Sequence, residues 1–288
     1  MIMALAAVLL TSPAAAAPAF MPLPGYTTSR AEEFPPNGKL LGEVEDPLAA
    51  LTADDGDLRD ALNSPPSAAW LMAGLRASNP EDRLAAVHSA AIPRHFSAIA
   101  PLAAVMLRID EQVEIRAAAA TALGRIGDAV AAPSLGEALS DLNPDVRYAA
   151  ALALGRLPAD GAATRLTRTL RSDPSWWVRY AAVLALGRTK KGFVVGALED
   201  TLRIEPKWQV RMLAVRSLQD VGTFRAIQAI STALRDKDSG VRTAAAMALG
   251  ELGNDAHLPL LSAALKAETD PTARAAHSAA YRRILSKP

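Results

Sequence analysis

Aromatic and basic side chains gather in the middle of the chain, around the stretch DPSWWVRYAAVLALGR at residues 173–188. Trp176 and Trp177 are adjacent in a chain that holds only four tryptophans. Residues 142–211 contain twelve Arg or Lys against six Asp or Glu. Aromatic rings framed by arginine are typical of hot spots in protein interfaces. This region therefore predicts recognition of a partner.

Eight residues are the predicted contacts of a protein or peptide partner. They are the aromatic, basic and methionine side chains of this region that share one predicted surface: Tyr148, Arg165, Arg168, Trp176, Trp177, Tyr180, Trp208 and Met212. The net charge of the whole chain is only +1. Such a balance gives no general attraction to nucleic acid, so we expect no specific nucleic-acid binding. Binding of an acidic envelope polymer or nucleic acid through residues 142–211 is one alternative, which the interspersed Asp and Glu make weaker.

Side chains for catalysis or metal binding form no recognisable pattern. The chain has no cysteine, and its four histidines form no H-x-x-x-H or H-E-x-x-H pair. Pro93 lies between His88 and His95 and should break a helix that would join them. Phosphate-binding, dinucleotide-binding and nucleophile-elbow motifs are also missing from the sequence. We therefore expect no enzyme activity, no metal and no cofactor.

An internal repeat supplies the elements that must position the aromatic residues. Seven arginines recur at intervals of 31 to 33 residues, namely Arg83, Arg116, Arg147, Arg179, Arg211, Arg242 and Arg274. Seven leucines recur with the same period, namely Leu75, Leu107, Leu139, Leu170, Leu202, Leu234 and Leu265. Because an arginine in every copy is more than a binding site needs, we interpret the arginine column as structural. Acidic residues and carbonyls at the turns, such as Asp141, Asp173, Glu205 and Asp236, are its expected partners.

Each repeat predicts a pair of helices. The first helix starts with a polar cap followed by Pro, as at Asp173-Pro174 and Asp270-Pro271, and carries an apolar stripe around the column arginine. Gly127, Gly222 and Gly253 suit left-handed helix ends. One hairpin cannot bury its own apolar face, whereas stacked hairpins can. The fold class expected is an all-α solenoid of about seven repeats.

The copies VRYAAALALGR (146–156), VRYAAVLALGR (178–188) and VRTAAAMALGELGN (241–254) carry a family resemblance. With a period near 31 residues, they resemble the HEAT-like repeats named after phycobilin lyases, over residues 78–288. The resemblance implies the solenoid fold. It also implies an alternative function, the handling of an anionic aromatic ligand of the tetrapyrrole type. The chain lacks the His-Glu dipeptides of the iron-binding HEAT-repeat hydroxylases, so that activity is not expected.

Counted from the column arginine, the aromatic residues fall at offsets −3, −2 and +1, opposite the apolar stripe of the first helix. Trp176, Trp177 and Tyr180 are then an outward cluster. Three interpretations are open for this cluster. It binds a partner, it is covered by the acidic, proline-rich residues 20–60 of the same chain, or it is partly buried packing between repeats.

The first residues suggest export from the cytoplasm. Residues 1–19 resemble a secretory signal peptide, with an apolar run at 2–10 and small residues after it, and an uncleaved anchor is the alternative. Residues 20–65 form an acidic strap or linker, with a degenerate first helix as an option, and residues 66–288 form the solenoid. The leading hypothesis is a non-enzymatic protein-interaction scaffold of the cell envelope, periplasmic or extracellular. No membrane span is expected after signal cleavage.

Overall fold

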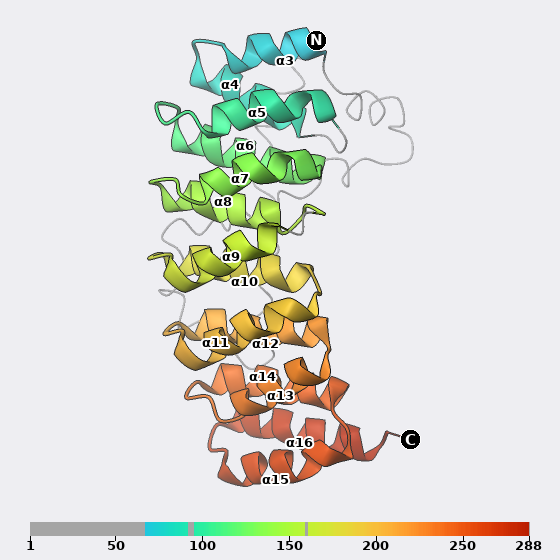
Figure 1. Cartoon of the computed structure of the whole chain (residues 1–288). Coiled ribbons are helices and arrows are strands. Elements are labelled where there is room, and N and C mark those ends of the chain that lie inside the picture. The colour runs from blue at the N-terminus through green and yellow to red at the C-terminus, as the bar shows by residue number, and fades with distance from the viewer. Residues whose placement is uncertain (1–66, 92–94, 159–160, 288) are drawn as a thin grey trace, which may run out of the picture. The chain divides into compact units, whose positions relative to one another are not determined.

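The computed structural model describes residues 67–91, 95–158 and 161–287, and every regular element in these ranges is helical (Figure 1). The predicted α-solenoid is confirmed. The predicted signal peptide, residues 1–19, and the strap, residues 20–65, lie outside the described residues.

The chain divides into two compact units, Met1–Ala153 and Leu154–Pro288, called here the N-terminal and C-terminal units. The described part of the N-terminal unit contains three helix pairs, in which α4 packs on α6. Its elements are α3 (Ala68–Leu75), α4 (Pro80–Ala90), η3 (Phe96–Ala98), α5 (Ile99–Met106), α6 (Val113–Ile126), η4 (Ala129–Ala131), α7 (Ala132–Ala138) and α8 (Pro144–Leu154), the last residue of which belongs to the other unit.

In the C-terminal unit the first helices of successive repeats pack side by side, α10 on α12, α12 on α14 and α14 on α16. A second helix follows each of α10, α12 and α14 across a short turn, while α16 ends the series (Figure 1). The elements are α9 (Ala162–Ser172), α10 (Trp176–Arg188), η5 (Gly192–Val194), α11 (Val195–Ile204), α12 (Trp208–Val221), α13 (Phe224–Ala233), α14 (Ser239–Leu252), η6 (Asp255–His257), α15 (Leu258–Ala267) and α16 (Pro271–Leu285).

The repeated sequence signals have direct structural causes, although the predicted helix start at Asp173-Pro174 is wrong: α10 starts at Trp176, and Asp173 accepts the backbone N–H of Ser175 in the turn before it. The Asp270 side chain accepts a hydrogen bond from Ala273 N at 2.8 Å, and Pro271 starts α16 without needing a donor. Gly127 and Gly222 end α6 and α12 with φ of 77° and 63°, as predicted. The same prediction is wrong for Gly253, whose φ is −72°. The chain leaves α14 in an extended conformation there, so no left-handed residue is needed.

The core of each unit combines the small apolar stripe of the first helices with large buried side chains of the second helices, such as Leu198 and Ile230. In α10, Val178, Ala182, Ala185 and Leu186 are fully buried. Small residues dominate because the neighbouring first helices approach closely. A Cβ placed on Gly155 would lie 2.6 Å from Cα of Ala185, and one on Gly124 would lie 2.7 Å from Cα of Ala153. The glycine of the repeated Leu-Gly pair therefore lies where the backbones of two successive first helices come into contact.

Candidate functional site

The column arginines lie at the turns that connect one repeat to the next. Arg179 donates from Nε and Nη2 to the Glu205 carboxylate at 2.8 and 2.7 Å. Its Nη1 donates to the carbonyls of Asp173 and Pro174 at 2.9 and 3.2 Å. Arg211 makes the same set of bonds with Asp236 and with the carbonyls of Glu205 and Pro206. The arginine thus closes its own turn and ties it to the next one.

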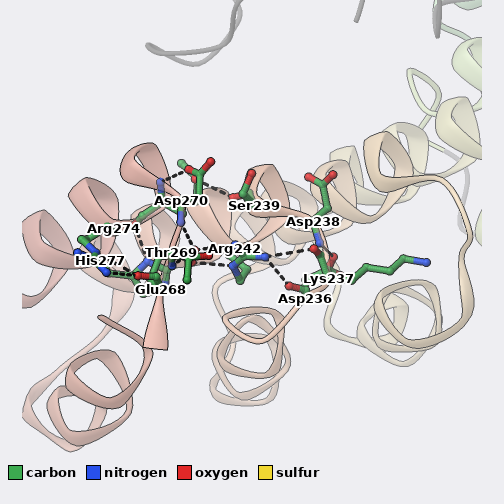
Figure 2. Close-up of polar contacts among 12 residues, drawn as sticks. Asp236, Lys237, Asp238, Ser239, Arg242, Glu268, Thr269, Asp270, Arg274 and His277 are labelled. Carbon is green, nitrogen blue, oxygen red and sulfur yellow. Dashed lines mark hydrogen bonds and ion pairs between the residues drawn. The ribbon is translucent and has the colours of Figure 1, made fainter. Parts of the chain in front are cut away.

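Figure 2 shows the next copy of this arrangement, in which Arg242 links the two turns around it. Arg242 donates to both carboxylate oxygens of Glu268 at 2.6 Å and, through Nη1, to the carbonyls of Asp236 and Lys237 at 2.9 and 3.2 Å. The acid is used twice, because Glu268 Oε1 also accepts the backbone N–H of Asp270 at 2.9 Å. These intramolecular bonds use the donors of the Arg242 guanidinium, in agreement with a structural role for the arginine column.

Arg83 repeats the full pattern: it donates to both carboxylate oxygens of Glu111 and to the carbonyls of Ala77 and Ser78, and Arg108 also contacts Glu111. Arg116 and Arg274 depart from the pattern. Arg116 reaches Asp141 through Nη1, while its buried Nε has no partner among the described residues. Arg147 donates to the carbonyls of Asp141 and Leu142. Arg274, on the last helix, donates to the carbonyl of Glu268, and its side chain is exposed.

The arginine column predicts loss of stability in acid. Hydrogen bonding to Arg242 lowers the pKa of Glu268 from 4.5 to about 2, and bonding to Arg83 does the same for Glu111. A lowered folded-state pKa stabilises the protein above the unfolded pKa and loses that effect as the pH falls. We therefore expect the urea midpoint to fall between pH 4.5 and 2. The Glu268→Gln variant should be less stable at pH 6 and show a smaller fall, whereas Glu251→Gln, at an exposed acid, should follow the wild type.

Two of the predicted contact residues are core residues. Tyr148 is 6% exposed and Met212 is 3% exposed, so the prediction that both face outward is wrong. The reason is that each inner helix of a solenoid has neighbours on two sides. Met212 lies on α12, which packs on both α10 and α14. The Met212 side chain, at offset +1, therefore packs against a neighbouring helix, although it lies opposite the apolar stripe of its own helix.

The other aromatic residues form a partly exposed cluster within the C-terminal unit. Trp176 and Trp177 meet edge to face, with their ring centres 6.1 Å apart and an interplanar angle of 87°. Lys207 Nζ lies 6.0 Å from the Trp176 ring centre, within cation–π range. Trp208, next to Lys207, is also partly exposed. The Trp177 Nε1 atom is buried without a hydrogen-bond partner among the described residues.

Tyr180 extends this cluster toward the next helix. Burial raises the pKa of Tyr180, and the positive charge of Arg216 on α12 opposes that rise. We call the surface of Trp176, Trp177, Tyr180, Lys207, Trp208 and Arg216 the Trp–Lys face. Lys207 and Arg216 are absent from the predicted contacts. Their positions, next to Trp208 and at offset +5, are the sequence signals that could have identified them.

The two predicted contact arginines of α9 are exposed. Arg165 and Arg168 lie on the solvent side of α9, where Arg171 pairs with Asp200 at 2.9 Å. The described contacts join neither Arg165 nor Arg168 to the tryptophans. Of the eight predicted residues, the structure brings Trp176 and Trp177 into contact, while Tyr180 and Trp208 are partly exposed in the same unit.

Comparison with known families identifies the repeats. The sequence profile described as HEAT repeats matches residues 67–141, 132–200 and 195–281. The chain belongs to the HEAT-repeat family. A comparison with curated proteins gives no match.

Solved structures with similar folds include proteins of different kinds. Human deoxyhypusine hydroxylase is 20% identical, with 83% of this chain and 92% of that chain covered and a TM-score of 0.39. The CpcE and CpcF complex of phycocyanin lyase from Nostoc sp. PCC7120 is 19% identical, with 84% and 99% covered and a TM-score of 0.46. A designed armadillo repeat protein is 16% identical, with 76% and 100% covered and a TM-score of 0.44.

In residues 67–91, 95–158 and 161–287, no three His, Cys, Asp or Glu side chains gather as a group that could hold a metal ion. None of the helices in these ranges is long and apolar enough to cross a membrane.

Proposed function

We propose that this HEAT-repeat protein is a non-catalytic interaction scaffold of the cell envelope, and that the Trp–Lys face binds a partner protein. The observation that carries the proposal is the partly exposed pair Trp176 and Trp177 with Lys207 over the Trp176 ring. Tryptophan supplies a large apolar contact area and few rotamers to order on binding, which suits a hot spot. HEAT repeats generally mediate protein interactions, in keeping with this role.

The charges around the face specify the chemistry of the partner. Helix α10 contains no acidic residue, and the acids of the turns before α10 and α12, Asp173 and Glu205, are buried. Lys207 and Arg216 therefore set the sign of the Trp–Lys face. A complementary partner presents an acidic segment with an apolar or aromatic side chain to lie against the tryptophans. By charge alone, residues 20–60 of this chain are a competing occupant.

The support for an envelope location is the signal-like sequence of residues 1–19. Purification of the protein from an envelope extract tests location and partner together. The intact mass of the recovered chain should match a protein that has lost its first residues by cleavage between Ala14 and Ala19. Recovery of the uncut chain from the cytoplasm would contradict the location.

We expect the Trp176→Ala/Lys207→Ala variant to bind the copurified partner about tenfold more weakly, because it removes a cation–π contact and part of the apolar surface. Isothermal titration calorimetry on the identified partner measures the change. Lys207→Glu is a second variant that keeps all rings and should weaken an acidic partner by a similar factor. Ile204→Ala, at a residue 63% exposed on α11, is the matched control.

Unchanged affinity in both face variants, with circular dichroism showing that they are folded, would exclude the Trp–Lys face as the binding site. A chain without residues 20–60 tests whether the strap covers the Trp–Lys face. If that chain binds the partner more tightly than the full chain, the strap competes for the face.

A further inference from the structure

A second exposed surface lies at two adjacent turns of the C-terminal unit, away from the tryptophans in sequence. Phe193, in the turn between α10 and α11, is 63% exposed, and Phe224, the first residue of α13, is 73% exposed. Their neighbours Val194 and Ala226 are buried, so the turns are anchored to the core. The two rings are therefore held outside by a fixed backbone, where they cannot contribute to the core.

The two turns contact each other. A Cβ on Gly192 would lie 3.8 Å from Thr223 Cγ2, and one on Gly196 would lie 3.7 Å from Arg225 Nη2. Arg225 then pairs with Glu199 of α11 through two hydrogen bonds of 3.0 and 2.6 Å. Phe193 and Phe224 each come one residue after the touching pair Gly192 and Thr223. We call Phe193 and Phe224, at these two contacting turns, the Phe ridge.

Basic residues accompany the Phe ridge. Residues 174–198 contain no Asp or Glu, and Arg188, Lys190 and Lys191 lead into Phe193. Arg188 and Lys190 are exposed. Lys190 has a φ of 50°, a left-handed conformation that is unfavourable for a residue with a Cβ and places a lysine where glycine or asparagine would fit with less strain. The nearby carboxylate of Glu199 is occupied by Arg225.

We propose that the Phe ridge docks the protein onto an anionic lipid surface, independently of the Trp–Lys face. Apolar rings at the tips of turns can enter the headgroup region without the partner having to provide a pocket. Lysine and arginine beside them remain at the level of the lipid phosphates and are attracted by their charge. A protein hot spot instead needs packed surroundings that exclude water around the anchor. The cavity lined by Leu170, Asp200 and Ile204 includes no residue of the Phe ridge.

The absence of cysteine from the chain allows a direct test. A polarity-sensitive fluorophore is attached to the single-cysteine variants Phe193→Cys, Phe224→Cys and Ile204→Cys of the full chain. Ile204 is a matched control, because it is also 63% exposed and lies at the far end of α11 from Phe193. With vesicles that contain phosphatidylglycerol, the emission should shift to the blue at 193 and 224 and stay unchanged at 204. Vesicles of phosphatidylcholine alone should produce no shift.

Cosedimentation with the same vesicles measures the affinity. We expect Phe193→Ser/Phe224→Ser to bind about tenfold more weakly or worse, since both inserted rings are lost. Lys190→Asn, which keeps a residue that accepts the left-handed conformation, should bind about fivefold more weakly. Trp176→Ala should bind as the wild type, which separates this surface from the proposed protein-binding face.

Three results would overturn the inference. They are no binding to phosphatidylglycerol vesicles at low salt, unchanged binding of the double serine variant, and an equal shift at position 204. A shift at 193 and 224 that requires an added envelope protein and occurs without lipid would assign the Phe ridge to a protein partner instead.

Discussion

Replacing Arg211 by methionine is expected to lower the free energy of unfolding of the C-terminal unit by about 3–5 kcal/mol. Arg211 is 2% exposed, and the side chain of its partner Asp236 is also buried. The variant removes the guanidinium from that carboxylate, which keeps only the backbone N–H of Asp238 among the described residues, and leaves the carbonyls of Glu205 and Pro206 without the Arg211 donor. An unpaired buried charge costs far more than the net contribution of the intact pair, so the single variant should show the full penalty.

The structure provides a matched control for this experiment. Arg225 makes the same two-bond contact with Glu199, but its side chain is 65% exposed, so Arg225→Met should destabilise the protein far less than Arg211→Met. Three of the four tryptophans lie in the C-terminal unit, so tryptophan fluorescence in urea reports mainly on that unit. Equal losses for Arg211→Met and Arg225→Met would show that burial of the arginine column does not determine its contribution.

The period of the sequence predicts the fold because a solenoid is built from local rules. The residues that determine each helix start, apolar stripe and turn lie within one repeat of about 32 residues, and neighbouring repeats contact each other in the same way. The arginine column can be recognised for the same reason. Which carboxylate each arginine takes is not local. Arg179 on α10 takes Glu205, in the turn that follows its own helix pair α10 and α11, because stacking places this turn beside the one that precedes α10.

The surface is harder to predict because exposure depends on neighbours as well as on the helix itself. A single-helix projection places Tyr180 and Met212 at the same offset, yet Met212 is buried and Tyr180 is partly exposed. Side-chain size and the composition of the adjacent helices decide between the two outcomes. The Phe ridge escapes a helical projection altogether, since Phe193 lies in a turn and Phe224 at a helix start.

A one-carbon addition at Gly187 is expected to destabilise the C-terminal unit by about 1–2 kcal/mol. A Cβ on Gly187 would lie 2.7 Å from Cβ and 3.2 Å from Cα of Ser217, a residue buried on the adjacent helix α12. Alanine has a helix propensity about 1 kcal/mol better than glycine, so local preference alone predicts that Gly187→Ala stabilises α10. Overpacking of a close helix contact costs about 1–3 kcal/mol, and here the obstacle includes backbone. The clash should therefore outweigh the propensity and determine the sign.

Urea unfolding of Gly187→Ala measures the effect, with Gly161→Ala as the control because a Cβ there meets nothing within 4 Å. Part of the stability should return in Gly187→Ala/Ser217→Gly, in which the opposing Cβ is removed while the close Cα remains. A stabilising Gly187→Ala would mean that α10 and α12 can separate at this point. The glycine of the repeated Leu-Gly pair would then be explained by its place near the end of the helix. The close approach of successive first helices would not be the reason for glycine at this position.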